Sequence, residues 1–229
     1  MISVIIPTLN EQADIRTTLE NVSCGSDIEI IIVDGGSRDK TLEVASDFRV
    51  KILSSSKGRA SQMNKGAQAA LGEVLLFLHA DTCLPPGFAD YVRRTISLPG
   101  ISAGAFRLSL TPPLPGLKLI ERLANWRSKI LQMPYGDQAI FVKTRLFEDL
   151  GGFSEMPIME DFDLVKRLRR QGRIAIVPVP VVSSARRWQQ GGVWRTTLKN
   201  QAVLAGYFLG IAPGRLGNWY HKPRKKLPC

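Results

Sequence analysis

Short apolar runs alternate with segments of helical spacing in the first hundred residues. The apolar runs lie at 2–7, 28–34, 50–54 and 73–79, and the helical segments lie at 11–22, 38–47 and 59–71. Runs of this length that are rich in Ile and Val are typical of buried strands. Their alternation with helices is typical of βαβ units. The pattern therefore predicts an α/β fold with a mostly parallel sheet and flanking helices, in the order β-α-β-α-β-α-β.

A different pattern follows in the second part of the chain. Partial alternation at 101–110 leads into the Pro-rich loop TPPLPG, and residues 117–132 have the spacing of an amphipathic helix. Further along we expect a strand at 138–143, a helix at 144–150, a helix beginning near residue 160 and a helix at 202–212. A chain of 229 residues with 44% hydrophobic content is typical of one large domain, so we expect a single domain over residues 1–229.

The charge balance of the chain is strongly basic. Lys and Arg number 31 against 20 Asp and Glu, which gives a net charge of +11. This balance favours anionic partners, namely phosphorylated substrates, anionic lipid or nucleic acid, and charge alone does not choose among them. Of two basic stretches, 166–173 is typical of a solvated helix face, and the Pro-containing tail 221–229 is expected to be frayed.

Cysteine usage and hydrophobic stretches bear on the cellular compartment. Cys24, Cys83 and Cys229 are odd in number and far apart, which indicates neither a disulfide framework nor a zinc site and favours a reducing cytoplasm. The N-terminus enters an apolar strand directly and shows no signal-peptide pattern. The apolar stretch 202–212 is shorter than the ~20 residues of a membrane span. We expect core packing there, with a peripheral contact to an anionic membrane, at its inner face, as the alternative.

Polar side chains follow the predicted strands at their carboxyl ends. The first strand ends in PTLNE, the second in DGGSRD with Asp34, and the fourth in HAD with His79 and Asp81. Because ligands of open parallel sheets bind at the carboxyl ends, we expect Asp34 and Asp81 to stand on the same edge. The dinucleotide fingerprint G-x-G-x-x-G and the P-loop are both absent. Carboxylates at this edge can accept hydrogen bonds from a ribose or base, or hold Mg²⁺ or Mn²⁺ against a diphosphate.

Five motifs carry a resemblance to a known family, in the order SVIIPTLNE, IIVDGGSRDKT, GRASQMNKGA, LLFLHADT and GGFSEMPIMEDFDLVKRLRRQG. Together they resemble family-2 glycosyltransferases of the GT-A fold over residues 1–175. More narrowly, GRASQMNKGA, HADT, YGDQAIFV and MEDFDLVKRLRRQG resemble the branch named for arsenosugar biosynthesis, a label that fixes no acceptor. The resemblance implies a Rossmann-like sheet with a nucleotide-sugar-binding half at 1–100 and an acceptor-binding, catalytic half at 101–229 with a helical C-terminus.

The resemblance also implies a reaction and the residues that carry it. The reaction is an inverting transfer of a sugar from a nucleotide diphosphate sugar to an acceptor hydroxyl, in one displacement assisted by Mn²⁺ or Mg²⁺. Asp161 falls at the general base, and Asp81 at the metal and diphosphate position. The other implied binding residues are Pro7, Thr8, Glu11 and Asp34 at the base and ribose, Arg59 in the stretch that lines the nucleotide and diphosphate, Gly136, Asp137 and Gln138 in the region of the donor sugar and acceptor, and Glu160 beside the base.

These roles agree with the chemistry of glycosyl transfer. A hydroxyl is a poor nucleophile, so a carboxylate within hydrogen-bond reach must take its proton as the new bond forms. We expect Glu160 and Asp163 to raise the proton affinity of Asp161 by like-charge repulsion. The leaving diphosphate gains negative charge, which cations such as Arg59 or Arg187 would stabilise.

The chain departs from the family pattern at two motifs. His79 stands where the D-x-D motif has its first Asp, and because imidazole suits Mg²⁺ less well than Mn²⁺, we expect a weaker metal dependence. The Q-x-x-R-W motif of processive members has Ser184 at the Gln position before Arg187 and Trp188. Together with the lack of long transmembrane segments, this departure disfavours a polysaccharide synthase.

Each motif also has a purely structural interpretation. Asp34 suits a turn, Asp81 suits the end of a strand, and the acidic residues at 160–163 suit the N-terminus of a helix. His79 is open between a ligand and a structural residue. The functional interpretation is favoured because several motifs occur in register.

Two other functions are alternatives. A sugar-phosphate nucleotidylyltransferase shares this sheet architecture but needs a Gly-rich loop after its first strand, where this chain reads PTLNEQAD. A basic nucleic-acid-binding protein is disfavoured because aromatic residues make up only 7% of the chain and no recognised binding motif occurs. We therefore expect a nucleotide sugar and a hydroxyl acceptor, and not a nucleic acid, as partners.

Overall fold

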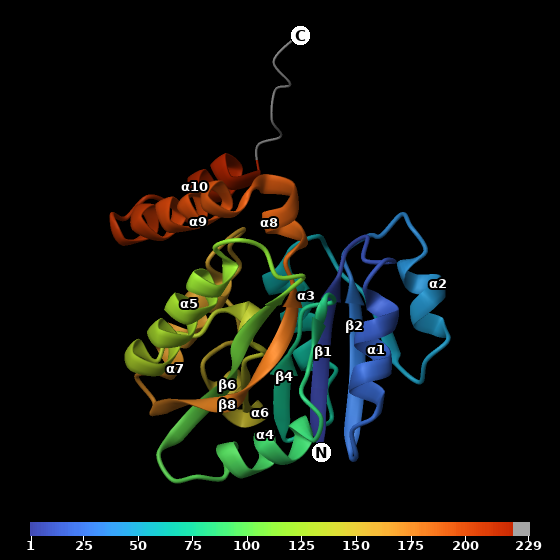
Figure 1. The fold of residues 1–229 in the computed structure, drawn as a ribbon. Coiled ribbons are helices and arrows are strands. Elements are labelled where there is room, and N and C mark those ends of the chain that lie inside the picture. The colour runs from blue at the N-terminus through green and yellow to red at the C-terminus, as the bar shows by residue number, and fades with distance from the viewer. Residues whose placement is uncertain (222–229) are drawn as a thin grey trace.

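Each apolar run that was expected to form a strand does so, and further strands extend the sheet. The computed structural model describes residues 1–221 as one eight-stranded sheet with helices on both faces (Figure 1). Most of the tail that was expected to be frayed, residues 222–229, lies outside the described residues. The strands are β1 (Ile2–Thr8), β2 (Ile28–Asp34), β3 (Lys51–Ser54), β4 (Val74–Phe77), β5 (Thr82–Cys83), β6 (Ile101–Thr111), β7 (Phe141–Lys143) and β8 (Arg173–Ser184).

The helices connect the strands and extend the chain beyond β8. They are α1 (Ile15–Ser23), α2 (Thr41–Ser46), α3 (Arg59–Gln68), α4 (Phe88–Ile96), α5 (Leu117–Leu131), the short 3₁₀ turn η1 (Gly136–Gln138), α6 (Thr144–Asp149), α7 (Glu160–Leu168), α8 (Arg186–Gly191), α9 (Val193–Phe208) and α10 (Pro213–His221). The predicted order of strands and helices is confirmed through β4. The sequence analysis did not anticipate α4 or β8.

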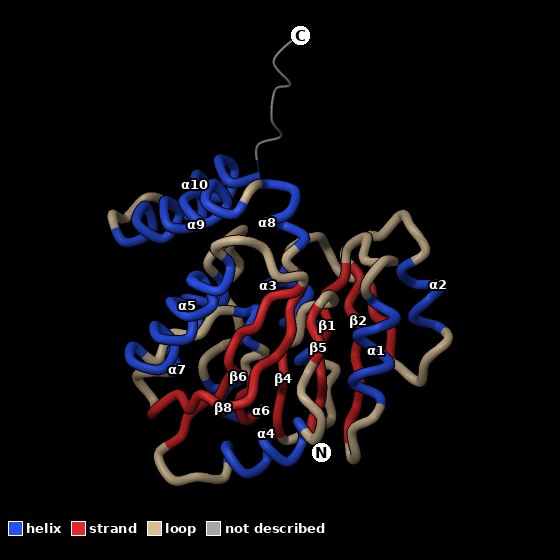
Figure 2. The backbone as a smooth tube through the Cα atoms, in the orientation of Figure 1, coloured by secondary structure: helices blue, strands red, loops and turns tan. Residues whose placement is uncertain are grey.

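The strand order β3-β2-β1-β4-β7-β6-β8-β5 joins a parallel half of the sheet to a mixed half. β1 is parallel to β2 and β4, and β2 is parallel to β3. Beyond β4, β7 runs antiparallel to both β4 and β6, while β8 is parallel to β6 and antiparallel to β5. The expected parallel sheet is therefore found from β3 to β4, and the strands that follow are mixed. Figure 2 shows the strands in red and the helices around them in blue.

The period of two along the strands divides the core between the two faces of the sheet. Val4 and Ile32 pack in one buried cluster with residues of α1 and α4, whereas Ile5 and Val33 pack in the other with residues of α3 and α7. Strands buried on both faces show continuous apolar runs, which explains why β1, β2 and β4 were recognised from sequence.

A glycine allows α3 to lie close to the sheet. A Cβ atom on Gly66 would stand 2.5 Å from Cγ2 of Ile5 and 3.0 Å from Cγ2 of Val33. A larger residue would push the helix away from β1 and β2. This close contact fixes the position of Arg59, the first residue of α3, near the carboxyl edge of the sheet.

The three C-terminal helices α8, α9 and α10 form a layer at the end of the sheet, at the top of Figure 1. The stretch 202–212, expected as one helix, is instead the end of α9 and a following turn with Gly210 at φ +79°. Within this stretch only Val203 and Gly206 are fully buried, so the expected core packing is limited to these positions. None of the helices in residues 1–221 is long and apolar enough to cross a membrane.

Candidate functional site

The carboxyl ends of β1, β2 and β4 form one edge of the sheet, as the sequence predicted. Thr8, the last residue of β1, lies opposite Asp34, the last residue of β2. His79 and Asp81 follow β4, the other neighbour of β1. The chemistry-bearing ends of the three strands are thus brought to the same part of the molecule.

Asp34 uses its carboxylate to close the turn after β2. Its Oδ2 atom accepts hydrogen bonds from the backbone N–H groups of Gly36 and Ser37, each at 2.9 Å. Its Oδ1 atom accepts the Ser37 hydroxyl at 2.5 Å, and the whole residue is buried. These contacts are those of a turn residue, which is the structural role considered for Asp34. A contact between Asp34 and a nucleotide stays a prediction.

Gln62 of α3 joins the ends of β1 and β2. Its Nε2 atom donates to the carbonyl oxygens of Thr8 and Val33 at 2.8 and 2.7 Å. Thr8 is itself buried, and its hydroxyl donates to Val33 at 3.4 Å, while Pro7 beside it is half-buried. The sequence analysis did not single out Gln62, although it lies within the motif GRASQMNKGA.

Arg186, at the start of α8, brings a cation to the acidic residues of this edge. Its guanidinium nitrogens lie 2.7 Å from Oε2 of Glu11, 2.9 Å from Oδ2 of Asp14 and 3.9 Å from Oδ2 of Asp81. Burial raises the pKa of Glu11 and of Asp81, and the charge of Arg186 opposes both shifts. The cation expected from the sequence was the next residue, Arg187.

Asp81 suits a divalent cation that a substrate brings with it. Among residues 1–221, no three His, Cys, Asp or Glu side chains are grouped as a metal site made of protein alone requires. Mg²⁺ is commonly held by one or two carboxylates together with substrate phosphates, and Asp81 next to Glu11 offers that arrangement. Burial, followed by the charges of Arg59 and Arg187, lowers the pKa of His79 well below its usual value. The imidazole is therefore neutral, the form in which histidine binds metals.

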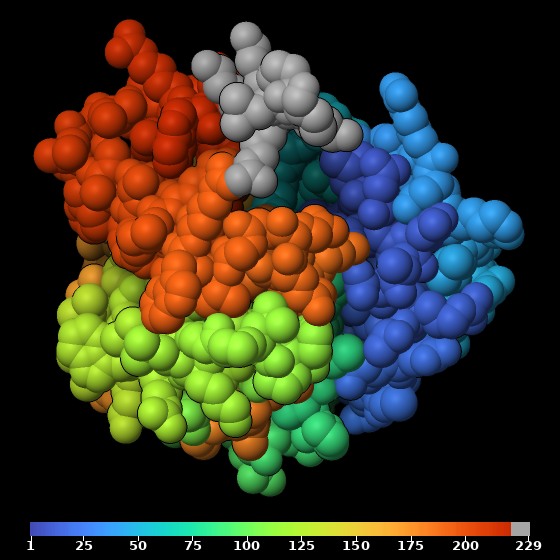
Figure 3. Space-filling model, turned by 45° about the horizontal axis from the view of Figure 1, so that its top comes forward, coloured from blue at the N-terminus to red at the C-terminus, as the bar shows by residue number. Residues whose placement is uncertain are grey.

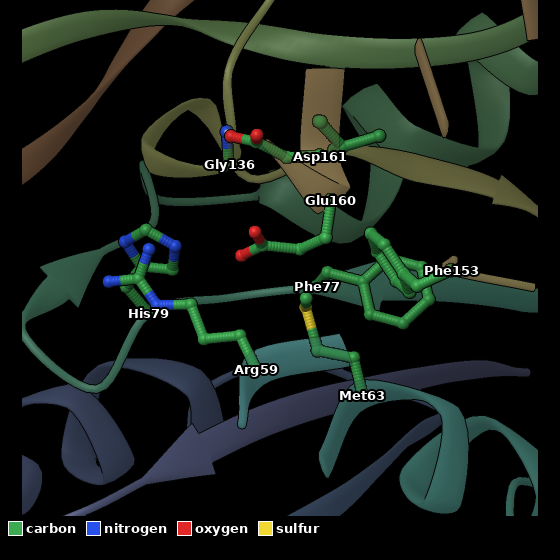
Figure 4. A pocket seen from close by; sticks show the side chains of 9 residues that line it. Arg59, Met63, Phe77, His79, Gly136, Phe153, Glu160 and Asp161 are labelled. Carbon is green, nitrogen blue, oxygen red and sulfur yellow. The ribbon is translucent and has the colours of Figure 1, made fainter. Parts of the chain in front are cut away.

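A pocket lies between the end of β4 and the start of α7 (Figure 4). In Figure 4 the Arg59 side chain reaches toward His79, and the Glu160 carboxylate points into the same space. The pocket is lined by Arg59, Met63, Phe77, His79, Gly136, Ile140, Phe153, Glu160 and Asp161. The tertiary structure thus gathers in one place five of the residues that the sequence had marked separately.

Two backbone amides hold Asp161 at the start of α7. Its Oδ2 atom accepts the N–H of Gly136 at 2.7 Å, and its Oδ1 atom accepts the N–H of Phe162 at 2.7 Å. A Cβ atom on Gly136 would stand 3.1 Å from Nε2 of His79 and 3.2 Å from Oδ2 of Asp161. Met159, just before α7, has a left-handed backbone at φ +71°, a strained conformation of the kind found at functional sites. Asp161 is therefore held in a fixed orientation at the pocket.

The carboxyl group of Glu160, next to Asp161, has a pKa that is raised toward neutrality. Burial, followed by the charge of Asp161, raises the pKa of Glu160 from 4.5 to about 7, and Arg59 opposes the shift. Asp163, which was expected to act on Asp161, is neutralised by Arg167, whose Nε lies 2.9 Å from its Oδ2. Asp163 does not line the pocket, whereas Glu160 lines it together with Asp161.

The turn η1 is fixed from behind by Gln138. This side chain is completely buried; its Oε1 atom accepts the Ser128 hydroxyl of α5 at 2.6 Å, and its Nε2 atom donates to the carbonyl of Phe106 at 2.9 Å. In the structure this buried side chain positions the turn, and the place of Gln138 in the donor-sugar and acceptor region stays a prediction. Oδ1 of Asp137 is buried and has no hydrogen-bond partner within residues 1–221, and burial raises the pKa of Asp137. An unpaired buried oxygen of this kind is rare in folded proteins and distinguishes Asp137 from Gln138 in this turn.

The mixed α/β sheet resembles that of GT-A glycosyltransferases of known structure. The mannosyltransferase PcManGT from Pyrobaculum calidifontis, solved with GDP-Man and Mn²⁺, superposes with a TM-score of 0.70 at 20% identity. That alignment covers 96% of this chain and 68% of the mannosyltransferase. Residues 3–96 match the model of Glycosyl transferase family 2.

Two curated relatives are similar in sequence. An uncharacterized glycosyltransferase of Haemophilus influenzae is 27% identical over 188 residues, which cover 75% of this chain and 63% of the relative. A PGL/p-HBAD biosynthesis glycosyltransferase of Mycobacterium bovis BCG is 39% identical over 94 residues, which cover 37% of this chain and 36% of that protein. The chain thus spans less than two thirds of the length of either relative.

Proposed function

We propose that the protein is an inverting glycosyltransferase that moves a sugar from a nucleotide diphosphate sugar to an acceptor hydroxyl. Asp161 would take the proton of that hydroxyl as its oxygen bonds to the anomeric carbon. In the same displacement the bond from the anomeric carbon to the diphosphate oxygen breaks, and the nucleoside diphosphate leaves. The similarity to the arsenosugar branch adds no acceptor to this proposal.

The observation that carries the proposal is the fixed carboxylate of Asp161 at a pocket whose other side holds Arg59. Asp161 receives N–H groups from Gly136 and Phe162, both at 2.7 Å, so the carboxylate oxygens keep their orientation without help from a substrate. Arg59 reaches into the same pocket from α3 (Figure 4). A base and a cation on opposite sides of one pocket are the parts that displacement of a diphosphate by a hydroxyl requires.

A divalent cation is part of the proposal, with Asp81 as its protein ligand. When bound, Mn²⁺ or Mg²⁺ would neutralise negative charge on the donor diphosphate. Arg186 already lies at 3.9 Å from Asp81 and 2.7 Å from Glu11, so the protein contributes positive charge of its own to this edge. The complex of PcManGT with GDP-Man and Mn²⁺ supports this part of the proposal by analogy of fold.

The proposal is tested by thermal shift with a panel of nucleotide diphosphate sugars, with and without Mn²⁺. We expect one donor to raise the Tm, because a ligand that binds the folded state stabilises it by mass action. The Asp81→Asn variant should lose the part of the shift that depends on Mn²⁺. The donor identified in this way is then incubated with candidate acceptors, and ¹H NMR of the product should show an inverted anomeric configuration. Absence of a shift with every donor, or a retained anomer, would refute the proposal.

A further inference from the structure

Helix α5 turns an apolar face toward solvent. Leu119, Leu123, Trp126 and Ile130 follow one another at intervals of four, three and four residues, which places them in one row along the helix. Each of the four side chains is between 48% and 58% exposed. A row of this length and exposure is unusual for a helix whose outer face meets only water.

Three polar residues of α5, namely Glu121, Asn125 and Ser128, face inward. Both Oδ1 and Nδ2 of Asn125 bind the backbone of Leu108 in β6, at 2.8 and 2.9 Å. Oε1 of Glu121 accepts the N–H of Leu110 at 2.7 Å, and Ser128 donates to Gln138. The inner face of α5 thus satisfies backbone groups of β6 and holds the turn η1. The four apolar side chains of the outer face stay about half exposed in the described residues 1–221.

The row continues onto α9. The start of α5 meets the start of α9, where a Cβ on Gly116 would stand 3.2 Å from the Trp194 ring. Trp194 and Leu198 lie one turn apart on α9 and are 58% and 68% exposed. α5 lies beside the segment that carries α8 and α9 in both Figure 1 and Figure 3. We call the surface made by Leu119, Leu123, Trp126, Ile130, Trp194 and Leu198 the α5/α9 face.

Basic side chains border this face. Lys118, Arg122 and Lys129 each precede a member of the row by one position, so they form a parallel row along one flank, and all three are exposed. Arg195 is exposed between Trp194 and Leu198. The sequence contains no Asp or Glu after Asp163, whereas its last nine residues contain four Lys or Arg. The partner that complements this face is therefore apolar at its centre and negatively charged at its surface.

We propose that the α5/α9 face docks on the surface of a lipid bilayer that contains anionic lipids. Apolar side chains flanked by Lys and Arg enter the boundary between headgroups and acyl chains, and the cations bind the lipid phosphates. A second copy of this chain fits less well, because its face would bring the same basic rows into contact in a molecule with a net charge of +11. The inner face of α5 contacts η1 through the hydrogen bond from Ser128 to Gln138, and Gly136 of η1 lines the pocket at Asp161. Docking of the outer face of α5 would therefore place this pocket near the lipid.

The proposal is tested by co-sedimentation with vesicles of phosphatidylcholine alone and of phosphatidylcholine with about one third phosphatidylglycerol. We expect the protein to bind the anionic vesicles and to stay in solution with the neutral ones. The double variant Leu123→Gln, Trp126→Gln should lower the partition coefficient at least about tenfold, because it removes two inserted side chains. The matched control Leu71→Gln, Leu98→Gln alters two exposed leucines elsewhere and should bind like the wild type.

A second pair of variants tests the basic flank. Lys118→Glu with Arg122→Glu should weaken binding to anionic vesicles, and Arg94→Glu with Arg145→Glu, two exposed arginines elsewhere, should weaken it much less. Circular dichroism confirms that each variant is folded. The proposal is overturned by equal binding to neutral vesicles, by binding that the Leu123 and Trp126 changes leave intact, or by a dimer in solution that these changes abolish. None of these measurements depends on sugar transfer, so their outcome is independent of the proposed activity.

Discussion

Replacing Asp161 by Asn separates the base from the donor site. Asparagine keeps the size of the side chain but exchanges one acceptor oxygen for an NH₂ group. In the structure both oxygens accept backbone N–H groups, from Gly136 and Phe162 at 2.7 Å. The amide can accept only one of them and turns a donor toward the other, so we expect a loss of about 1–3 kcal/mol in the free energy of unfolding.

The effect on transfer should be larger than the effect on stability. A positioned general base contributes roughly 10²–10⁴ to the rate, which corresponds to about 3–5 kcal/mol in the activation free energy. Asp161→Asn should therefore lower kcat by at least about a hundredfold, because the amide cannot take the acceptor proton. Donor affinity, measured by calorimetry, should change little because Arg59 and Asp81 are untouched.

Asp163→Asn is the matched control on the same helix. It alters another carboxyl of the first turn of α7, one that pairs with Arg167 at 2.9 Å. It should lower stability by about 1 kcal/mol and leave kcat within a few-fold of the wild type. The reasoning is refuted if Asp161→Asn keeps more than about a tenth of the activity, or if it loses donor affinity in parallel with activity.

Three further changes test other parts of the site. The pKa of Glu160 is raised from 4.5 to about 7 in the folded state, so its contribution to stability is complete below pH 4.5 and is lost as the pH rises to 7. Glu160→Gln should remove this loss. Above pH 7 we expect the variant to gain up to about 3 kcal/mol in the free energy of unfolding, measured with denaturant. Gly136→Ala should lower kcat about tenfold or more with little change in donor affinity, because the methyl group crowds His79, and unchanged kinetics would contradict this. Arg186→Ala removes the ion pair between α8 and Glu11, so we expect faster hydrogen exchange in α9 and α10 relative to the sheet. Unchanged exchange in these helices would show that the ion pair does not stabilise them.

The sequence by itself determined the parallel half of the fold, because each strand of that half can be recognised from its own segment of sequence. β4 is a continuous apolar run, β1 and β2 are apolar apart from Ser3 and Glu29 near their starts, and polar residues stand at or just after the end of each strand. Strands buried on both faces are apolar at nearly every position, so their limits can be recognised without knowledge of their neighbours. The placement of Asp34 and Asp81 on one edge follows from parallel pairing alone.

Other elements were harder to recognise from the sequence. β8 contains two prolines and partly exposed residues, and it is held mainly by its long pairing with β6, a partner that local periodicity does not reveal. The stretch 202–212 is apolar like a core helix, yet most of it is exposed, and only Val203 and Gly206 are buried. Apolar composition predicts burial only when another element is present to cover the surface.

For the candidate site too, the sequence identified some residues and only the tertiary structure showed their contacts. The motifs marked Asp81 and Asp161, but only the folded chain shows that Gly136 donates to Asp161 and that Arg186 pairs with Glu11. It also gave Gln138 a buried positioning role. These contacts join residues on different elements, and their distances depend on how helices pack on the sheet. A sequence states which side chains are present and which local structure they favour, whereas the packing of elements distant along the chain decides which of them meet.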